Sequence, residues 1–164
     1  MATTTSGTAK VTLPADNQIL ITREFNAPRP LVWKAYTTPE LVRRWWAGEK
    51  GTVTSAEIDL RPGGRWRSVM QANAGFEVAF HGEYREVRAP ERLVNTEVFE
   101  GIPDAEDHAG LITVTFTEKD GRTLMEMLCD YRDRTDRDAV VDSGMEGGMQ
   151  ESMDYLEKVA VALA

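Results

Sequence analysis

The chain has 164 residues, of which 41% are hydrophobic, and its 19 basic and 27 acidic residues give a formal net charge of −8 at pH 7. This length fits one globular domain. The acidic balance argues against nucleic acid or an anionic membrane as the main partner.

The N-terminal part of the chain contains a segment without periodicity, then one predicted strand and two predicted helices. Residues 1–16 are rich in Thr, Ser and Ala without periodicity, which predicts a mobile tail before a single domain over residues 17–164. Apolar alternation over residues 18–25 predicts the first strand. Two short helices are expected next, one with Pro28 and Pro30 in its first turn that ends near Thr37 and one over residues 39–46, because apolar residues recur at helical spacing.

The middle of the chain has a period of two for about eighty residues, which is typical of strands. Six further strands are predicted, at residues 53–60, 65–71, 76–87, 93–99, 111–118 and 122–131. Short turns join most of them, so sequential strands are expected to be antiparallel neighbours. The predicted fold is therefore α+β, a curved seven-stranded antiparallel sheet.

The C-terminal part predicts one long helix from about Asp136, with apolar residues at a spacing of three and four. A helix of about 25 residues would be about 38 Å long and could cross the whole sheet, which would wrap around it. Gly144, Gly147 and Gly148 interrupt this helix. Either the helix is thin there to leave room for a ligand, or a strand approaches it closely.

Large soft side chains are expected to meet between sheet and helix. By strand parity and helix spacing, they form a candidate ligand-binding cavity, and Phe76 shares the same parity. The candidate residues are Trp45, Trp66, Met70, Phe80, Tyr84, Thr96, Met125, Met127, Met145 and Met149. The alternative is that these residues simply fill a core.

Other chemistry has little support in the sequence. The metal-ligand candidates His81, His108 and Cys129 are widely spaced, so neither a metal nor a cofactor is predicted, and no catalytic set is assigned. His81 and Glu83 are expected to point outward. Cys129 is expected to be an inert buried thiol, because no cation is predicted beside it.

Five short segments resemble the activator of heat shock protein ATPase homologue family. They are FNAPRPLVW at 25–33, WW at 45–46, EIDLRPGGRW at 57–66, HGEY at 81–84 and PERL at 90–93. The resemblance spans roughly residues 19–163. It implies membership of the START-like (SRPBCC, birch-allergen-like) superfamily, with a helix-grip fold and a hydrophobic cavity between the sheet and the C-terminal helix.

The resemblance implies a function only in outline. The leading hypothesis is a non-enzymatic, stress-related domain that binds a small apolar ligand. It is expected in the cytoplasm, because the first ten residues lack a signal peptide's apolar stretch and no apolar run approaches about 20 residues. The alternatives are a protein-interaction module, with a homodimer or a chaperone as partner, and an enzyme acting on a hydrophobic or polyketide-like substrate with Tyr84 or His81 as acid or base.

Overall fold

The structure is a computed structural model that describes residues 9–164. Its strands are β1 (Lys10–Thr12), β2 (Gln18–Phe25), β3 (Gly51–Ile58), β4 (Arg65–Ala72), β5 (Glu77–Arg88), β6 (Arg92–Phe99), β7 (Gly110–Lys119) and β8 (Arg122–Asp130). Its helices are α1 (Arg29–Thr37), α2 (Pro39–Trp45), the 3-10 helix η1 (Ala105–His108), α3 (Arg134–Asp142) and α4 (Met145–Ala162).

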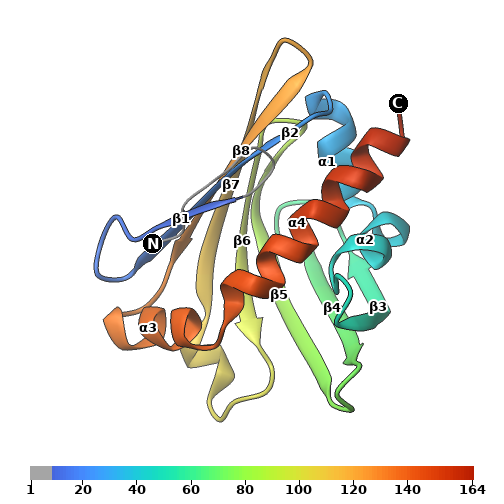
Figure 1. Cartoon of the computed structure of the whole chain (residues 1–164). Coiled ribbons are helices and arrows are strands. Elements are labelled where there is room, and N and C mark those ends of the chain that lie inside the picture. Colours follow the sequence, from blue (N-terminus) through green and yellow to red (C-terminus); the bar gives the residue numbers. More distant parts are fainter. Residues whose placement is uncertain (1–8) are drawn as a thin grey trace.

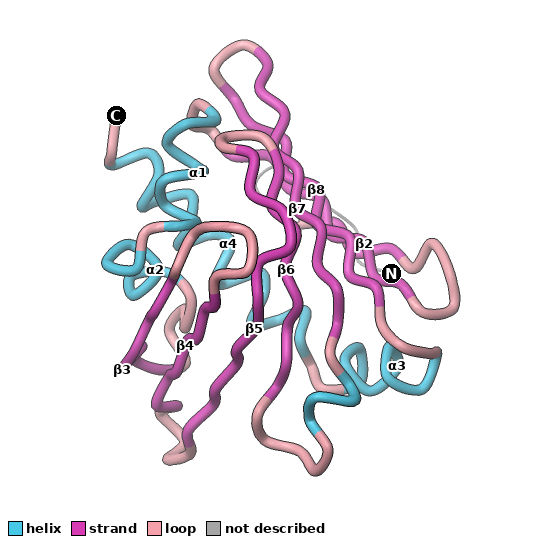
Figure 2. Tube along the Cα trace, turned by 180° about the vertical axis from the view of Figure 1, so that it is seen from behind, coloured by secondary structure: helices cyan, strands magenta, loops and turns pink. Residues whose placement is uncertain are grey.

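The strands form one antiparallel sheet in the order β1-β2-β8-β7-β6-β5-β4-β3, which Figure 2 shows from behind. The sheet curves around α4, and α1 and α2 lie beside that helix on the same face (Figure 1). We call the face toward α4 the inner face and the opposite one the outer face. This arrangement confirms the predicted α+β helix-grip fold.

The strand count differs from the predicted seven, because β1 lies within the segment expected to be a mobile tail. Val11 pairs with Ile21 of β2 and is buried. The Gln150 side chain of α4 holds Ala9 at two points: its Oε1 accepts a 2.9 Å hydrogen bond from the Ala9 amide, and its Nε2 donates a 2.8 Å bond to the Ala9 carbonyl. Residues 1–8 of the predicted tail lie outside the described residues.

The prediction of one continuous C-terminal helix is wrong, because the chain breaks into α3 and α4. Gly144 has a φ of 80°, a left-handed conformation that ends α3 and precedes α4. Helix α3 also begins slightly before the expected start near Asp136. The Asp133 carboxylate caps it by accepting a 2.9 Å hydrogen bond from the Asp136 amide.

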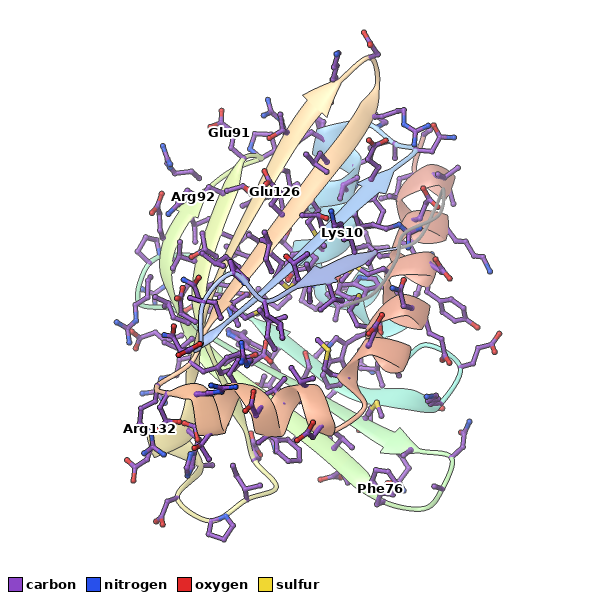
Figure 3. The ribbon with its side chains drawn as sticks, turned by 60° about the vertical axis from the view of Figure 1, so that its left-hand side comes forward. Lys10, Phe76, Glu91, Arg92, Glu126 and Arg132 are labelled. Atoms are coloured by element: carbon purple, nitrogen blue, oxygen red, sulfur yellow. The ribbon has the colours of Figure 1, made fainter. Side chains whose placement is uncertain are left out.

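The core is tightest under the C-terminal half of α4. Leu156 and Ala160 are fully buried there, together with Phe25 of β2 and Phe116 of β7. Charged side chains instead cover the outer face, where Lys10 and Glu126 are exposed (Figure 3). The alternation of buried and exposed residues along β2 and β7 follows from this division into an inner and an outer face.

Candidate functional site

Met127 of β8 marks a space between the sheet and the N-terminal half of α4. It lies on the inner face between Ile21 of β2 and Val114 of β7, which are 2% and 0% exposed. Met127 nevertheless keeps part of its surface accessible. A side chain flanked by fully buried neighbours can stay accessible in this way only when the layer above it leaves room.

The helix α4 is thin in its first turn. A Cβ built on Gly148 would meet no atom within 4 Å, and one on Gly147 would meet only the Lys50 Nζ at 3.9 Å. The idea that a closely approaching strand requires these glycines is therefore wrong. Met145 lies three residues before Gly148 and four before Met149, so it shares a helix face with each of them, and both methionines are half-buried against the core. We call the space bordered by Met127, Met145, Gly148 and Met149 the interior hollow.

The structure brings most of the predicted cavity residues to this side of the sheet. The strand registers place six of them on the inner face, while Met145 and Met149 come from α4 and Trp45 from α2. The six are Trp66, Met70, Phe80, Tyr84, Met125 and Met127.

Three of the predicted cavity residues are buried in the core: Trp45, Met125 and Tyr84, of which Tyr84 is 5% exposed. Trp45 is 5% exposed, stacks on Tyr36 at 5.5 Å between ring centroids and donates a 2.9 Å hydrogen bond to the Ala35 carbonyl. Met125 is fully buried. For these residues, the alternative that the predicted cavity residues fill a core is therefore the one that the burial supports.

Thr96 and Phe76 lie elsewhere. Thr96 faces outward, because its cross-strand partner Leu111 lies on the outer face and its Oγ1 accepts a 2.9 Å hydrogen bond from the Glu83 amide. Phe76 is 56% exposed at the turn between β4 and β5 (Figure 3). The apolar pattern of β6 was misleading because Val98, which faces outward, is buried where the segment of η1 lies over it.

Glu97 of β6 is the inward residue that the sequence reasoning missed. It pairs with Gly110 of β7 and lies two residues along β6 from Asn95, whose pair with Ile112 is buried on the inner face, so Glu97 points to the same face. Within residues 9–164 its carboxyl has no hydrogen-bond or ion-pair partner, and burial raises its pKa to about 7. Its side chain still keeps part of its surface accessible on the inner face, the face that the interior hollow adjoins. The sequence did contain a signal for this orientation, because Glu97 lies an even number of residues from the apolar Leu93 on the same strand.

Aromatic rings stand on both sides of Glu97. A Cβ built on Gly110 would lie 2.8 Å from a ring carbon of Tyr131, so that ring covers Gly110 on the inner face. On the other side, a Cβ on Gly82 of β5 would lie 2.6 Å from the Trp66 Nε1. Because β5 and β7 both pair with β6, the two rings form walls beside the carboxyl.

The other titratable groups near Glu97 remain neutral. Burial raises the pKa of Tyr36, Tyr131 and Cys129, and the Glu97 carboxylate raises each of them further. Burial also raises the pKa of Tyr84. The thiol of Cys129 is therefore held in its unreactive form, in agreement with the sequence analysis.

A second hollow, of about 960 Å³, lies on the outer face near η1. Several of its charged groups are already paired with one another. Arg67 bonds Glu100 at 2.9 Å, and the two ring nitrogens of His81 lie 2.7 Å from carboxylate oxygens of Glu100 and Glu106. This network ties the η1 segment to the sheet. It also places His81 outward as expected, so His81 cannot serve as acid or base in the interior hollow.

Neither a metal centre nor a spanning helix is found in the described part of the chain. No group of three or more His, Cys, Asp or Glu residues among residues 9–164 is arranged to hold a metal ion. No helix within the same range is long and apolar enough to cross a membrane.

Comparison with solved structures supports the fold. A protein from Rhodobacter sphaeroides is 24% identical with a TM-score of 0.85, over 94% of this chain and 99% of that one. Protein Ms6760 from Mycobacterium smegmatis is 26% identical with a TM-score of 0.83, over 93% and 96% of the two chains. An AHSA1-like protein from Aeromonas hydrophila is 24% identical with a TM-score of 0.67, over 88% and 93%.

Comparison with curated proteins finds no match. The family model described as Activator of Hsp90 ATPase homolog 1-like protein matches residues 26–160, which is more than half of the chain. The protein therefore belongs to the Activator of Hsp90 ATPase homolog 1-like family, with the helix-grip fold of the START-like superfamily.

Proposed function

We propose that the protein is a non-enzymatic START-like domain that binds one small, mainly apolar molecule in the interior hollow. The observation that carries the proposal is the accessible surface that Met127 keeps between fully buried neighbours, with the half-buried Met145 and Met149 of α4 packed against the same core and open space beside Gly148. Apolar ligands are bound in such spaces when water leaves the walls and the ligand surface together. The proposed setting is the cytoplasm, and the stress-related role is the one that the family resemblance implies.

The lining suits a ligand of irregular shape. Methionine side chains are flexible and polarizable, so Met127, Met145 and Met149 can adapt to different molecular outlines. Trp66 adds a large aromatic surface on the inner face of β4. The interaction-module alternative needs none of these features, since it would use the outer face or an exposed strand edge.

A pair of neighbouring glycines allows a sharp test. Gly148→Phe would place a phenyl ring in the space beneath α4, where no atom lies within 4 Å of the new Cβ. Gly147→Phe, one residue away, is exposed and serves as the matched control. Both substitutions replace a helical glycine by a residue with a higher helix propensity, so we expect each variant to keep the fold. The circular dichroism spectrum of each variant checks this.

The probe is N-phenyl-1-naphthylamine, a neutral apolar molecule whose fluorescence rises when it leaves water. We expect binding by the full chain and by Gly147→Phe, and at least tenfold weaker binding by Gly148→Phe. At a free probe concentration 100 times the Kd, binding should add about 2.7 kcal/mol to the free energy of unfolding. Absence of binding by the unmodified chain, or equal binding by both variants, would refute the proposed site.

A further inference from the structure

The charge inventory of the inner face is unusual for a hollow expected to hold an apolar molecule. Glu97 is the acidic side chain beside the hollow, and it has no partner among the described residues. The basic side chain that the registers place on the described inner face is Arg23 of β2, which Asp154 and Glu157 already bind at 2.8 and 3.0 Å. Among the strand residues of the inner face, the charge of a ligand therefore meets one unpaired carboxylate and no unpaired cation.

The surroundings of Glu97 favour one kind of positive group. Tyr131 covers Gly110 on one side, and Trp66 covers Gly82 on the other, so aromatic rings flank the carboxyl. A cation is attracted by a carboxylate and also by the face of a tryptophan or tyrosine ring. Because the Trp66 Nε1 donates its hydrogen bond to the Thr96 carbonyl, its ring is held in place by a bond that a ligand does not need to break.

We propose that Glu97 selects ligands that carry a protonated amine on an apolar body, with the ammonium group against the Glu97 carboxylate and between the rings of Trp66 and Tyr131. This inference rests on the proposed function, because it assigns the ligand class of the same hollow. An amine supplies N–H donors to a carboxylate that lacks any, and it removes the cost of keeping that carboxylate unpaired in the interior. A ligand with a carboxylate would add a second negative charge beside Glu97 and is disfavoured.

The ligand class also fixes the direction of the pH dependence. Amine binding should weaken as the pH falls through about 7, because Glu97 becomes protonated there. The neighbouring groups that face it are Tyr36 of α1, Tyr84 of β5, Cys129 of β8 and Tyr131 after β8. The pKa of each is raised, so these groups stay uncharged at neutral pH and do not contribute to the change.

Three probes with one skeleton test the assignment: 1-naphthylmethylamine, 1-naphthalenemethanol and 1-naphthoate. Isothermal titration calorimetry of the full chain at pH 8 should give the amine at least tenfold tighter binding than the alcohol, with the carboxylate weakest. Glu97→Gln should remove the advantage of the amine and leave the alcohol within about twofold. Glu83→Gln, which changes the net charge equally but on the outer face, should leave the amine affinity unchanged.

Lowering the pH from 8 to 6 should weaken amine binding by about tenfold. The reason is that the ionised fraction of a carboxyl group with a pKa of about 7 falls by about the same factor. Equal affinity for amine and alcohol, or an amine preference that survives Glu97→Gln, would overturn this inference while binding in the hollow stands. If none of the three probes binds and N-phenyl-1-naphthylamine does not bind either, the proposed function fails as well.

Discussion

The Trp66 indole nitrogen donates a 3.1 Å hydrogen bond to the Thr96 carbonyl oxygen, and this bond crosses the sheet directly over Gly82. Trp66 lies on β4 and Thr96 on β6, so the bond spans the intervening strand β5. It is possible because residue 82 has no side chain. The bond holds the Trp66 ring as one wall beside Glu97.

Gly82→Ala should therefore be strongly destabilising. The new Cβ would overlap the Thr96 carbonyl oxygen and would lie 2.6 Å from the Trp66 Nε1. The first of these atoms belongs to the backbone of β6, so relief requires strand displacement and loss of the indole bond. We expect the free energy of unfolding to fall by about 3 kcal/mol, measured by urea denaturation monitored by circular dichroism.

Gly148→Ala is the control for that substitution. No atom lies within 4 Å of the new Cβ, and the residue is helical. We expect the free energy of unfolding to rise by up to about 1 kcal/mol, the difference in helix propensity between Ala and Gly. If Gly82→Ala were as stable as Gly148→Ala, the close approach of β6 to Gly82 would be contradicted.

Local patterns were sufficient to predict the sheet and the side on which most cavity residues lie. Strand parity places Trp66, Phe80 and Tyr84 together because β4 and β5 alternate regularly and adjoin in the sheet. Parity was misleading in β6, where the buried Val98 faces outward and the titratable Glu97 faces inward. A strand that is covered on both faces carries no clean alternation, so the sequence alone left its orientation undetermined.

Long-range contacts explain the other two differences. The short strand β1 depends on the bonds between Ala9 and Gln150, which are 141 positions apart and leave no local signal. The break before α4 depends on the backbone of Gly144, but glycine at 144 is also compatible with an uninterrupted helix. The N-cap at Asp133 was the available clue that a separate helix begins earlier.

Arg23 gives a prediction about buried charge. Its side chain is 1% exposed on the inner face, while the Asp154 and Glu157 side chains that bind it are 53% and 26% exposed. Removing both carboxylates with Asp154→Asn and Glu157→Gln leaves an unpaired cation in the core. We expect the free energy of unfolding to fall by about 3 kcal/mol, since the cost arises from the buried charge and not from the lost attraction alone.

Arg23→Met is the matched variant for this pair. It removes the buried cation itself, keeps a side chain of similar length, and leaves two carboxylates that already contact water. The loss of stability should therefore be less than half that of the double carboxylate variant, in the same urea experiment. An equal or larger loss for Arg23→Met would show that the pair is stabilised mainly by its mutual attraction.

The protonation of His81 makes the network of His81, Glu100 and Glu106 on the outer face dependent on pH. Burial opposes its charge, but hydrogen bonds with Glu100 and Glu106 outweigh that effect and raise its pKa above the ordinary 6.5. Glu100 stays ionised through this range, because the hydrogen bond from Arg67 holds its pKa at about 2. The protonated imidazole is therefore held between the carboxylates of Glu100, which follows β6, and Glu106 of η1.

The stability that this clamp contributes should decrease as the pH rises. A group whose pKa is higher in the folded than in the unfolded chain stabilises the fold fully below its unfolded pKa, here about 6.5, and loses that contribution as the pH passes its folded value. The unfolding free energy of the natural chain should therefore exceed that of His81→Gln by more at pH 5.5 than at pH 8.5. Glu106→Gln, which removes one of the two partners, should reduce this pH dependence. A difference that stays constant or grows with pH would show that His81 is neutral in the folded protein, and that the η1 segment is held by Glu100 and packing alone.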